Sequence, residues 1–414
     1  MLSLDLIQTI AFAGLVLFAG YGIRRAVPPL ARYNIPAPVV GGLLVAVAIS
    51  VARARGRMLL SFDTTLQTPL MIAFFTSIGF GASLGLLRVG GPLVVSFFVV
   101  STIAAVGQNV VGVLCARLLG QHPLMGVLAG SVTLTGGPAT GLAFAPLFEA
   151  AGVPAAATLA VAAAMVGIVS GGLIGGPIGT WLIARDRLAT PRSSRGAMPH
   201  VPAQQIVEER MATTLTPAPA GEDRESYALL KTLVVMLTAM WLGGIFSEWL
   251  NGVLAGFGMA LPAYIGSMIT AAVIRNLDDL TGLIGIPQAI VDDLGNVALS
   301  IFLVLALMTL RLWEIMNVAV PLAVIVFVQV ALVALLCVWP IYRLMGRDYQ
   351  GAVIASGFCG FMLGTTANAM ANMEALVERY GPAPRAFLVV PMVGAFFIDF
   401  TNGLIITAFL NLFR

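Results

Sequence analysis

Two long uncharged runs constrain this chain more than any other feature of its sequence. Residues 160–183 and 318–342 contain no Asp, Glu, Lys, Arg or His. A helix of about 20 apolar residues crosses the hydrocarbon core of a bilayer, which is about 30 Å thick. Of all 414 residues, 59% are hydrophobic and 10% are charged, whereas soluble domains carry about 25% charged residues. The sequence therefore predicts an all-α, multi-pass integral membrane protein in a lipid bilayer.

Eight weaker apolar segments raise the expected number of transmembrane helices to about ten. The expected spans are 5–23, 35–52, 69–87, 93–116, 160–183, 228–250, 260–274, 288–310, 318–342 and 386–410. Two other apolar stretches, near 123–150 and 350–376, are rich in Gly, Thr, Pro and Asn. Backbone that is broken at membrane depth must be shielded by protein or line a cavity. We therefore expect each of these two stretches to be a re-entrant hairpin.

A polar segment divides the chain into two halves. Residues 185–227 are rich in Arg, Glu, Pro, Ser and Thr, which is typical of a linker between an N-terminal half, 1–184, and a C-terminal half, 228–414. With the N-terminus outside, 16 of the 22 Lys and Arg residues lie on the cytoplasmic side and 6 lie outside. The positive-inside rule therefore predicts a cytoplasmic linker.

The two halves share short matching segments at a nearly constant offset of 226 or 227 residues. The matching pairs are Ile35–Ala37 with Leu261–Ala263, Val127–Ala129 with Val353–Ala355, and Met165–Gly167 with Met392–Gly394. Each half then contains five spans and one hairpin, and an odd number of crossings inserts the second half upside down. Inverted repeats of this kind are typical of secondary transporters, although a duplication kept only for packing would leave the same pattern.

Several functional classes are excluded by composition. A net charge of +3 without a basic stripe argues against nucleic acid as a partner. The single lysine, Lys231, follows two leucines rather than the glycine of a phosphate-binding loop, which argues against an ATP-driven pump. The three cysteines and two histidines are too scattered for a metal cluster or a catalytic triad. We do not expect an enzyme.

The two hairpins carry the residues best suited to bind a small anion. Glycines allow sharp turns and close approach of backbone amides, and hydroxyls and carboxamides offer both donors and oxygens. A half-helix that begins at such a turn also presents partial positive charge. The predicted substrate-binding residues are Ser131, Thr133, Thr135, Gly136, Gly137 and Thr140 in the first hairpin and Gly360, Gly364, Thr365, Thr366, Asn368 and Asn372 in the second. Close helix packing through small residues and hydroxyl groups is the alternative.

Asp399 lies within the last expected span, where a carboxylate is costly to bury and needs a partner. A sodium ion would be one such partner, with oxygens from Thr401 and Asn402. Gln108 and Asn109, adjacent carboxamides inside another span, could line the same cavity and are predicted to add oxygens to the ion site. Asn296 raises the same possibility with less support. The alternatives are a protonated structural carboxyl group for Asp399 and helix-to-helix hydrogen bonds for the amides.

The chain resembles the bacterial sodium/glutamate symporter family from end to end, apart from the linker. The stretches that carry the resemblance are Tyr33–Val45, Pro69–Met71, Ile78–Gly79, Pro123–Gly126, Thr133–Gly137, Gly171–Pro177 and Leu388–Asp399. Two positions depart from the family pattern as we expect it. Pro138 and Phe358 stand where we expect histidines.

The resemblance implies symport of L-glutamate with sodium ions across the bacterial inner membrane. It also implies two inverted five-span repeats, a homodimer and an elevator-like movement in an alternating-access cycle. The alternative is a sodium- or proton-coupled carrier of another organic anion, such as a dicarboxylate. A passive channel would require a continuous polar pore, which two broken segments at the membrane midplane argue against.

Overall fold

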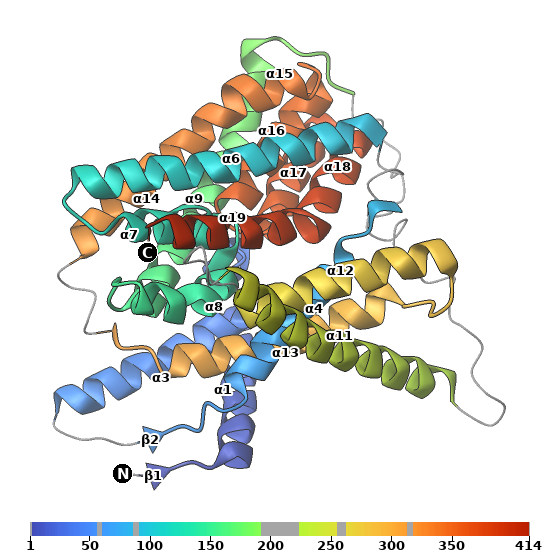
Figure 1. The fold of residues 1–414 in the computed structure, drawn as a ribbon. Coiled ribbons are helices and arrows are strands. Elements are labelled where there is room, and N and C mark those ends of the chain that lie inside the picture. The colour runs from blue at the N-terminus through green and yellow to red at the C-terminus, as the bar shows by residue number, and fades with distance from the viewer. Residues whose placement is uncertain are drawn as a thin grey trace.

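The computed structural model describes residues 2–55, 60–85, 91–191, 223–254, 262–312 and 318–413 (Figure 1). Residues 192–222 of the predicted linker therefore lie outside the described residues. Apart from one pair of two-residue parallel strands, β1 (Leu2–Ser3) and β2 (Leu60–Ser61), all the regular elements are helices. The expectation of an all-α membrane protein is confirmed in this coarse sense.

Six helices, three from each half, form one bundle, which lies in the lower part of Figure 1. They are α1 (Leu6–Ala26), α3 (Ala37–Ala54), α4 (Gln67–Gly81), α11 (Arg224–Leu254), α12 (Ala263–Thr281) and α13 (Gln288–Met308). A short helix, α2 (Pro28–Arg32), joins α1 to α3. Helix α12 packs between α11 and α4, and α13 packs against α3 and α4. We call this the six-helix bundle.

Glycine contacts bring two pairs of helices in the six-helix bundle unusually close. A β-carbon on Gly20 of α1 would lie 2.2 Å from the carbonyl oxygen of Ala37 in α3. A β-carbon on Gly243 of α11 would lie 2.3 Å from the Cα of Ser267 in α12. Small residues at such crossings are typical of membrane helices, because they allow the two backbones to touch. The α1–α3 and α11–α12 pairs are thus built alike.

The remaining helices form a second bundle that contains both predicted hairpins, and we call it the hairpin bundle. From the first half come α6 (Gly91–Leu118), α7 (Pro123–Val127), a π-helical turn (Leu128–Val132), α8 (Gly137–Ala150) and α9 (Ala156–Arg185). From the second half come α14 (Ala319–Leu336), a π-helical turn (Cys337–Ile341), α15 (Tyr342–Leu344), α16 (Tyr349–Met362), α17 (Thr366–Tyr380), α18 (Pro384–Phe396) and α19 (Ile398–Phe413). This bundle is the upper part of Figure 1.

Both predicted hairpins are helices interrupted by a break. In the first, Gly130 leaves helical geometry with φ −100° and ψ −130°, and α8 begins after Gly136. In the second, α16 ends at Met362 and α17 begins at Thr366. Every residue of α16 from Gly351 to Met362 is buried, so this helix lies inside the bundle rather than at its lipid-facing surface.

Seven described helical segments are long and apolar enough to cross a bilayer: α1, α3, α6, α9, α11, α13 and the continuous segment 319–344. The pair α18 and α19, bent by 41°, would make an eighth. Two of the ten expected spans are not among them. Helix α4 has only 15 residues, and the last turns of α12 carry Arg275, Asp278 and Asp279.

Candidate functional site

The two breaks meet at one cavity of about 440 Å³. The hairpin bundle contributes Thr135, Gly136, Gly137, Pro138, Ala139, Phe361, Gly364, Thr365, Thr366, Ala367, Gly394, Ile398 and Asp399. The six-helix bundle, with the segment that leads into α3, contributes Tyr21, Arg24, Pro36, Ala37, Pro38, Phe74, Asn296, Leu299, Ser300 and Leu303. The cavity therefore lies between the two bundles.

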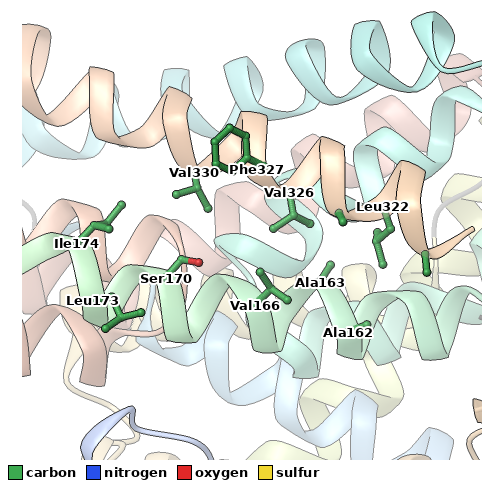
Figure 2. Close-up of a pocket in the computed structure, with 12 residues that line it drawn as sticks. Ala162, Ala163, Val166, Ser170, Leu173, Ile174, Leu322, Val326, Phe327 and Val330 are labelled. Carbon is green, nitrogen blue, oxygen red and sulfur yellow. The ribbon is translucent and has the colours of Figure 1, made fainter.

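A second cavity, of about 540 Å³, is unsuited to a charged ligand. It lies between α9 and α14, and Figure 2 shows that the labelled side chains around it are apolar except for Ser170. A charged molecule would lose its hydration here without gaining partners. The cavity at the breaks is accordingly the candidate site.

The tips of the two breaks face each other across the candidate site. A β-carbon on Gly137 would lie 3.6 Å from the carbonyl oxygen of Gly364 and 3.9 Å from the methyl carbon of Thr365. Gly137 also has φ +69°, a left-handed conformation that glycine adopts with little strain. Glycine at this position therefore sets the turn, and a β-carbon there would make only ordinary contacts with the second tip.

The second break offers unused hydrogen-bond donors to the cavity. Thr365 precedes α17 in an extended conformation, but its hydroxyl does not cap the helix. That hydroxyl is buried and has no hydrogen-bond partner among the described residues. The first turn of α17 contains no acidic side chain, so its free amides and partial positive charge are available to an anionic group.

The first break is instead braced from behind by Gln108 of α6. The Thr135 hydroxyl donates to Gln108 Oε1 at 2.7 Å, and Gln108 Nε2 donates to the carbonyl oxygen of Met362 at 3.0 Å. Gln329 Nε2 in turn donates to the Gln108 carbonyl oxygen at 2.6 Å. The carboxamide of Gln108 thus joins the first break to the end of α16, and both of its polar atoms are already in use.

A second polar cluster lies deeper, where α6, the first break and α19 meet. Asn109 Oδ1 accepts from the Ser131 amide at 3.0 Å, and Asn402 Nδ2 donates to the Ser131 carbonyl oxygen at 2.9 Å. The Ser131 hydroxyl, Asn402 Oδ1 and Asn109 Nδ2 are buried without partners among the described residues. Two of these three atoms are oxygens of the kind that bind small hard cations.

Asp399 connects this cluster to the cavity. It lies in the first turn of α19, at the bend that follows α18, and it lines the cavity. In the sequence it stands in the middle of the last expected span, and in the structure it follows the bend between α18 and α19 near the middle of that helix pair. Asp399 and Asn402 are three residues apart and share one face of α19. Within the described residues no three His, Cys, Asp or Glu side chains gather, so any cation here would rely largely on neutral oxygens.

The other predicted site residues lie behind the cavity wall. Thr133 donates to the carbonyl oxygen of Leu128 at 2.8 Å, and Thr401 donates to carbonyl oxygens in the turn before it at 3.2 and 3.4 Å. Thr140 packs over Gly136, where a β-carbon would lie 2.6 Å from the Thr140 Cβ. The described contacts of these residues are those of the packing alternative, and their binding role remains a prediction.

Three predicted residues of the second hairpin tie its helices to their neighbours. Asn368 Nδ2 donates to the carbonyl oxygen of Ile168 at 2.8 Å, and Asn372 Nδ2 donates to that of Gly171 at 3.0 Å, so both fasten α17 to α9. Gly360 allows α16 and α17 to touch, since a β-carbon there would lie 2.6 Å from the Ala369 nitrogen. Asn368 Oδ1 is buried without a partner among the described residues.

Sequence reasoning missed most of the wall that the six-helix bundle provides, and of that wall it considered only Asn296 as a cavity residue. Tyr21 and Arg24 lie three residues apart on α1, and Asn296 and Ser300 lie four apart on α13. These spacings place each pair on one helix face. For the α13 pair, two polar side chains at helical spacing inside a span were the available signal. Arg24 entered the sequence analysis only as part of the charge count.

Only one of the two departures from the family pattern touches the cavity. Phe358 is buried in an aromatic cluster, with ring centroids 6.0 Å from Phe97 and 5.4 Å from Phe361, and it does not line the cavity. Pro138 does line it, in the first turn of α8. A proline there has no amide hydrogen to donate.

Comparisons with known proteins identify the family of the chain. A family model described as "Sodium/glutamate symporter" matches residues 2–382. The chain is 40% identical over 413 residues to a protein named sodium/glutamate symporter from Escherichia coli (strain K12), covering 100% of this chain and 99% of that protein. A protein of the same name from Haemophilus influenzae is 37% identical over 398 residues, covering 96% of this chain and 95% of that protein.

Proposed function

Because the chain belongs to the sodium/glutamate symporter family, we propose that it carries L-glutamate together with sodium ions through the cavity between the two breaks. The family is one of transporters, in agreement with the expectation that the chain is not an enzyme. The observation that carries the proposal is that segments far apart in the sequence line the same cavity. The two breaks lie more than 200 residues apart in sequence, yet their tips and Asp399 line one cavity.

In this proposal the substrate is held by donors at the breaks. A carboxylate of the substrate accepts hydrogen bonds from the Thr365 hydroxyl and from the first amides of α17. Gly137 leaves the tip of the first break without a side chain, so the substrate can approach the backbone there. The brace at Gln108 holds this tip against α16 while the cavity is occupied.

In this proposal sodium binds between Asp399 and the polar cluster of Asn109, Ser131 and Asn402. Asp399 lines the cavity, and Asn402 Oδ1 and the Ser131 hydroxyl are buried oxygens without partners among the described residues. A sodium ion there would satisfy the unpartnered Asn402 and Ser131 oxygens and compensate the charge of Asp399. Because the Ser131 backbone is also bonded to Asn109 and Asn402, ion binding would order the first break and so couple sodium to substrate.

We further propose that the two bundles move relative to each other in an elevator-type cycle between inverted repeats. Two observations support two equivalent halves, 1–184 and 228–414: the similar packing of α1 on α3 and of α11 on α12, and the matching sequence segments. In the proposal a cytoplasmic linker at 185–227 joins these halves. Both breaks are bonded within the hairpin bundle and would travel with it. A bacterial inner-membrane location and a homodimer complete the proposal.

The first experiment is uptake of labelled L-glutamate into proteoliposomes that contain the purified protein. We expect accumulation when sodium is higher outside, and none when sodium is equal on both sides or replaced by potassium. Uptake that saturates but is indifferent to the sodium gradient would exclude sodium coupling. Asp399→Asn should abolish sodium-driven accumulation, whereas Asp5→Asn, at an exposed helix cap where Asn replaces Asp well, should not. Normal sodium-driven uptake by Asp399→Asn would remove Asp399 from the ion site.

The elevator movement has its own test. Spin labels on Ala11 of α1 and Ala375 of α17, two exposed positions on different bundles, report the distance between the bundles. We expect the distance distribution to shift when sodium and glutamate are added. A distribution that stays the same under all conditions argues against movement of the bundles.

One observation favours a second substrate class, another organic anion such as a dicarboxylate, coupled to sodium or protons. Pro138 lines the cavity at a position where we expect histidine in the family. A competition panel of aspartate, glutamine and simple dicarboxylates against labelled glutamate separates the two substrate classes. Stronger competition by a dicarboxylate than by unlabelled glutamate would favour the second.

A further inference from the structure

Of the described residues that line the cavity, Arg24 and Asp399 are the two with charged side chains, and they come from opposite bundles. Among the described residues, Arg24 forms no ion pair, whereas Arg185, Arg275, Arg347 and Arg385 each pair with an aspartate. Its neighbour Arg25 is exposed and does not line the cavity. Arg24 thus has both an accessible guanidinium group and a position that faces the two breaks.

The packing of α1 fixes where Arg24 lies. Gly20, one helical turn earlier, is pressed against the start of α3, since a β-carbon there would lie 2.2 Å from the carbonyl oxygen of Ala37 and 3.0 Å from the nitrogen of Gly41. Residues four apart share one face of a helix. Arg24 is therefore held beside Pro36–Pro38, which line the same cavity. Its backbone position follows from a glycine contact that no larger residue could make without a shift.

The charges of the cavity match those of an acidic amino acid. Such a substrate carries two carboxylates and one ammonium group. The second break offers uncharged donors for one carboxylate. Asp399 is assigned to sodium in the proposed function, so Arg24 is the charged side chain of the cavity that is left for the second carboxylate. The planar fork of an arginine can form two parallel hydrogen bonds with a carboxylate, which makes it more selective for that shape than a point charge.

We propose that Arg24 pairs with the side-chain carboxylate of the substrate and makes the carrier select an acidic side chain over its amide. The assignment rests on the proposed function, because it concerns the same cavity. The acidic side chain is recognised by the six-helix bundle, and the rest of the substrate by the hairpin bundle. Arg24 is thus a specificity-determining residue that acts where the six-helix bundle and the hairpin bundle face each other across the cavity.

The test compares Arg24→Gln, Arg24→Lys and the control Arg25→Gln in proteoliposomes with equal amounts of protein. The measurements are the KM for glutamate and the inhibition constant of glutamine under a sodium gradient. Loss of a charge-assisted hydrogen-bond pair should raise the glutamate KM about 10- to 100-fold in Arg24→Gln. The glutamine constant, the maximal rate and the sodium dependence should stay within about twofold, and Arg25→Gln should behave like the unmodified protein.

Arg24→Lys keeps the charge and loses the fork, so its glutamate KM should rise roughly threefold to tenfold while the glutamine constant is unchanged. If Arg24→Gln does not insert into the membrane, the KM values of Arg24→Lys test the proposal. An unchanged ratio of glutamate to glutamine in the Arg24 variants overturns the proposal, and so does an equal effect of Arg25→Gln. If the unmodified protein carries another anion, the proposed substrate is wrong. The same ratio, measured with that anion and its amide, then tests Arg24 separately.

Discussion

The two breaks resemble each other in composition but differ in how their polar atoms are used. At the first break, Thr135 donates to Gln108, and the Gly136 amide donates to the Ser131 carbonyl oxygen at 3.0 Å. At the second, the Thr365 hydroxyl has no partner among the described residues and the start of α17 carries no side-chain cap. The first break is therefore a braced surface, and the second has hydrogen-bond donors that are free to bind a ligand.

This difference explains how two similar segments can divide a task. A polar group buried without a partner costs free energy, so unpaired donors persist where a ligand repays that cost. A tip whose Thr135 hydroxyl and Gly136 amide are already bonded keeps its shape whether or not a ligand is present. In terms of the proposed function, the first break sets the geometry of the site and the second makes the contacts that substrate binding completes.

The largest effect should come from Gln108→Leu, which removes the brace and keeps the side-chain size similar. It leaves the Thr135 hydroxyl with only the Met362 sulfur, a weak acceptor at 3.7 Å, and it removes the Gln108 donor from the Met362 carbonyl oxygen. A buried polar group that loses its partner costs about 1–3 kcal/mol. We expect a lower melting temperature in detergent and at least about a tenfold loss of uptake. Thr407→Val, which removes a 2.8 Å bond within α19 only, is the control. Equal effects of the two changes would contradict a special role for the brace.

Thr365→Val should have a smaller and more selective effect. It removes an unpaired hydroxyl and no internal hydrogen bond, so stability should be unchanged or slightly higher. The KM for substrate should rise about tenfold, since one hydrogen bond to a charged group is worth about 1.5–3 kcal/mol. Thr133→Val, which removes a bond to Leu128 behind the cavity wall, should leave the KM unchanged. A rise in KM for Thr133→Val as large as that for Thr365→Val would erase the distinction between paired and unpaired hydroxyls.

Much of the hairpin bundle could be predicted from the sequence because its signals are local. Glycine, proline and threonine in an apolar stretch indicate broken helices, and Thr135, Gly137 and Thr365 were found in this way. Asp399 was found because a carboxylate in an apolar segment stands out. The matching segments 127–129 and 353–355 put the two breaks at corresponding positions in the two halves.

Other features depend on packing that no local pattern records. Arg24 lies at the end of an ordinary apolar helix, and only the contact of Gly20 with Ala37 turns it towards the cavity. Gln108 was predicted as an ion ligand, because a carboxamide pattern does not show which partners its two polar atoms will find. The expected spans at α4 and α12 do not correspond to helices that are long and apolar enough to cross a bilayer. The apolar pattern did not show that α4 would be only 15 residues long or that α12 would extend into charged residues.

The smallest expected effect comes from Gly137→Ala, at the tip of the first break. At φ +69° a β-carbon is strained, which costs about 1–2 kcal/mol for a left-handed residue. The new methyl group would also lie 3.6 Å from the Gly364 carbonyl oxygen, an ordinary contact that narrows the cavity without blocking it.

The matched control for Gly137→Ala is Gly14→Ala within α1, where a β-carbon meets nothing within 4 Å. Alanine is favoured over glycine inside a helix by up to about 1 kcal/mol, so this change should stabilise the protein slightly. The two glycine-to-alanine changes should therefore shift the melting temperature in opposite directions. If Gly137→Ala is also stabilising, the first break does not keep a fixed left-handed turn, and its description as a braced surface would have to be given up.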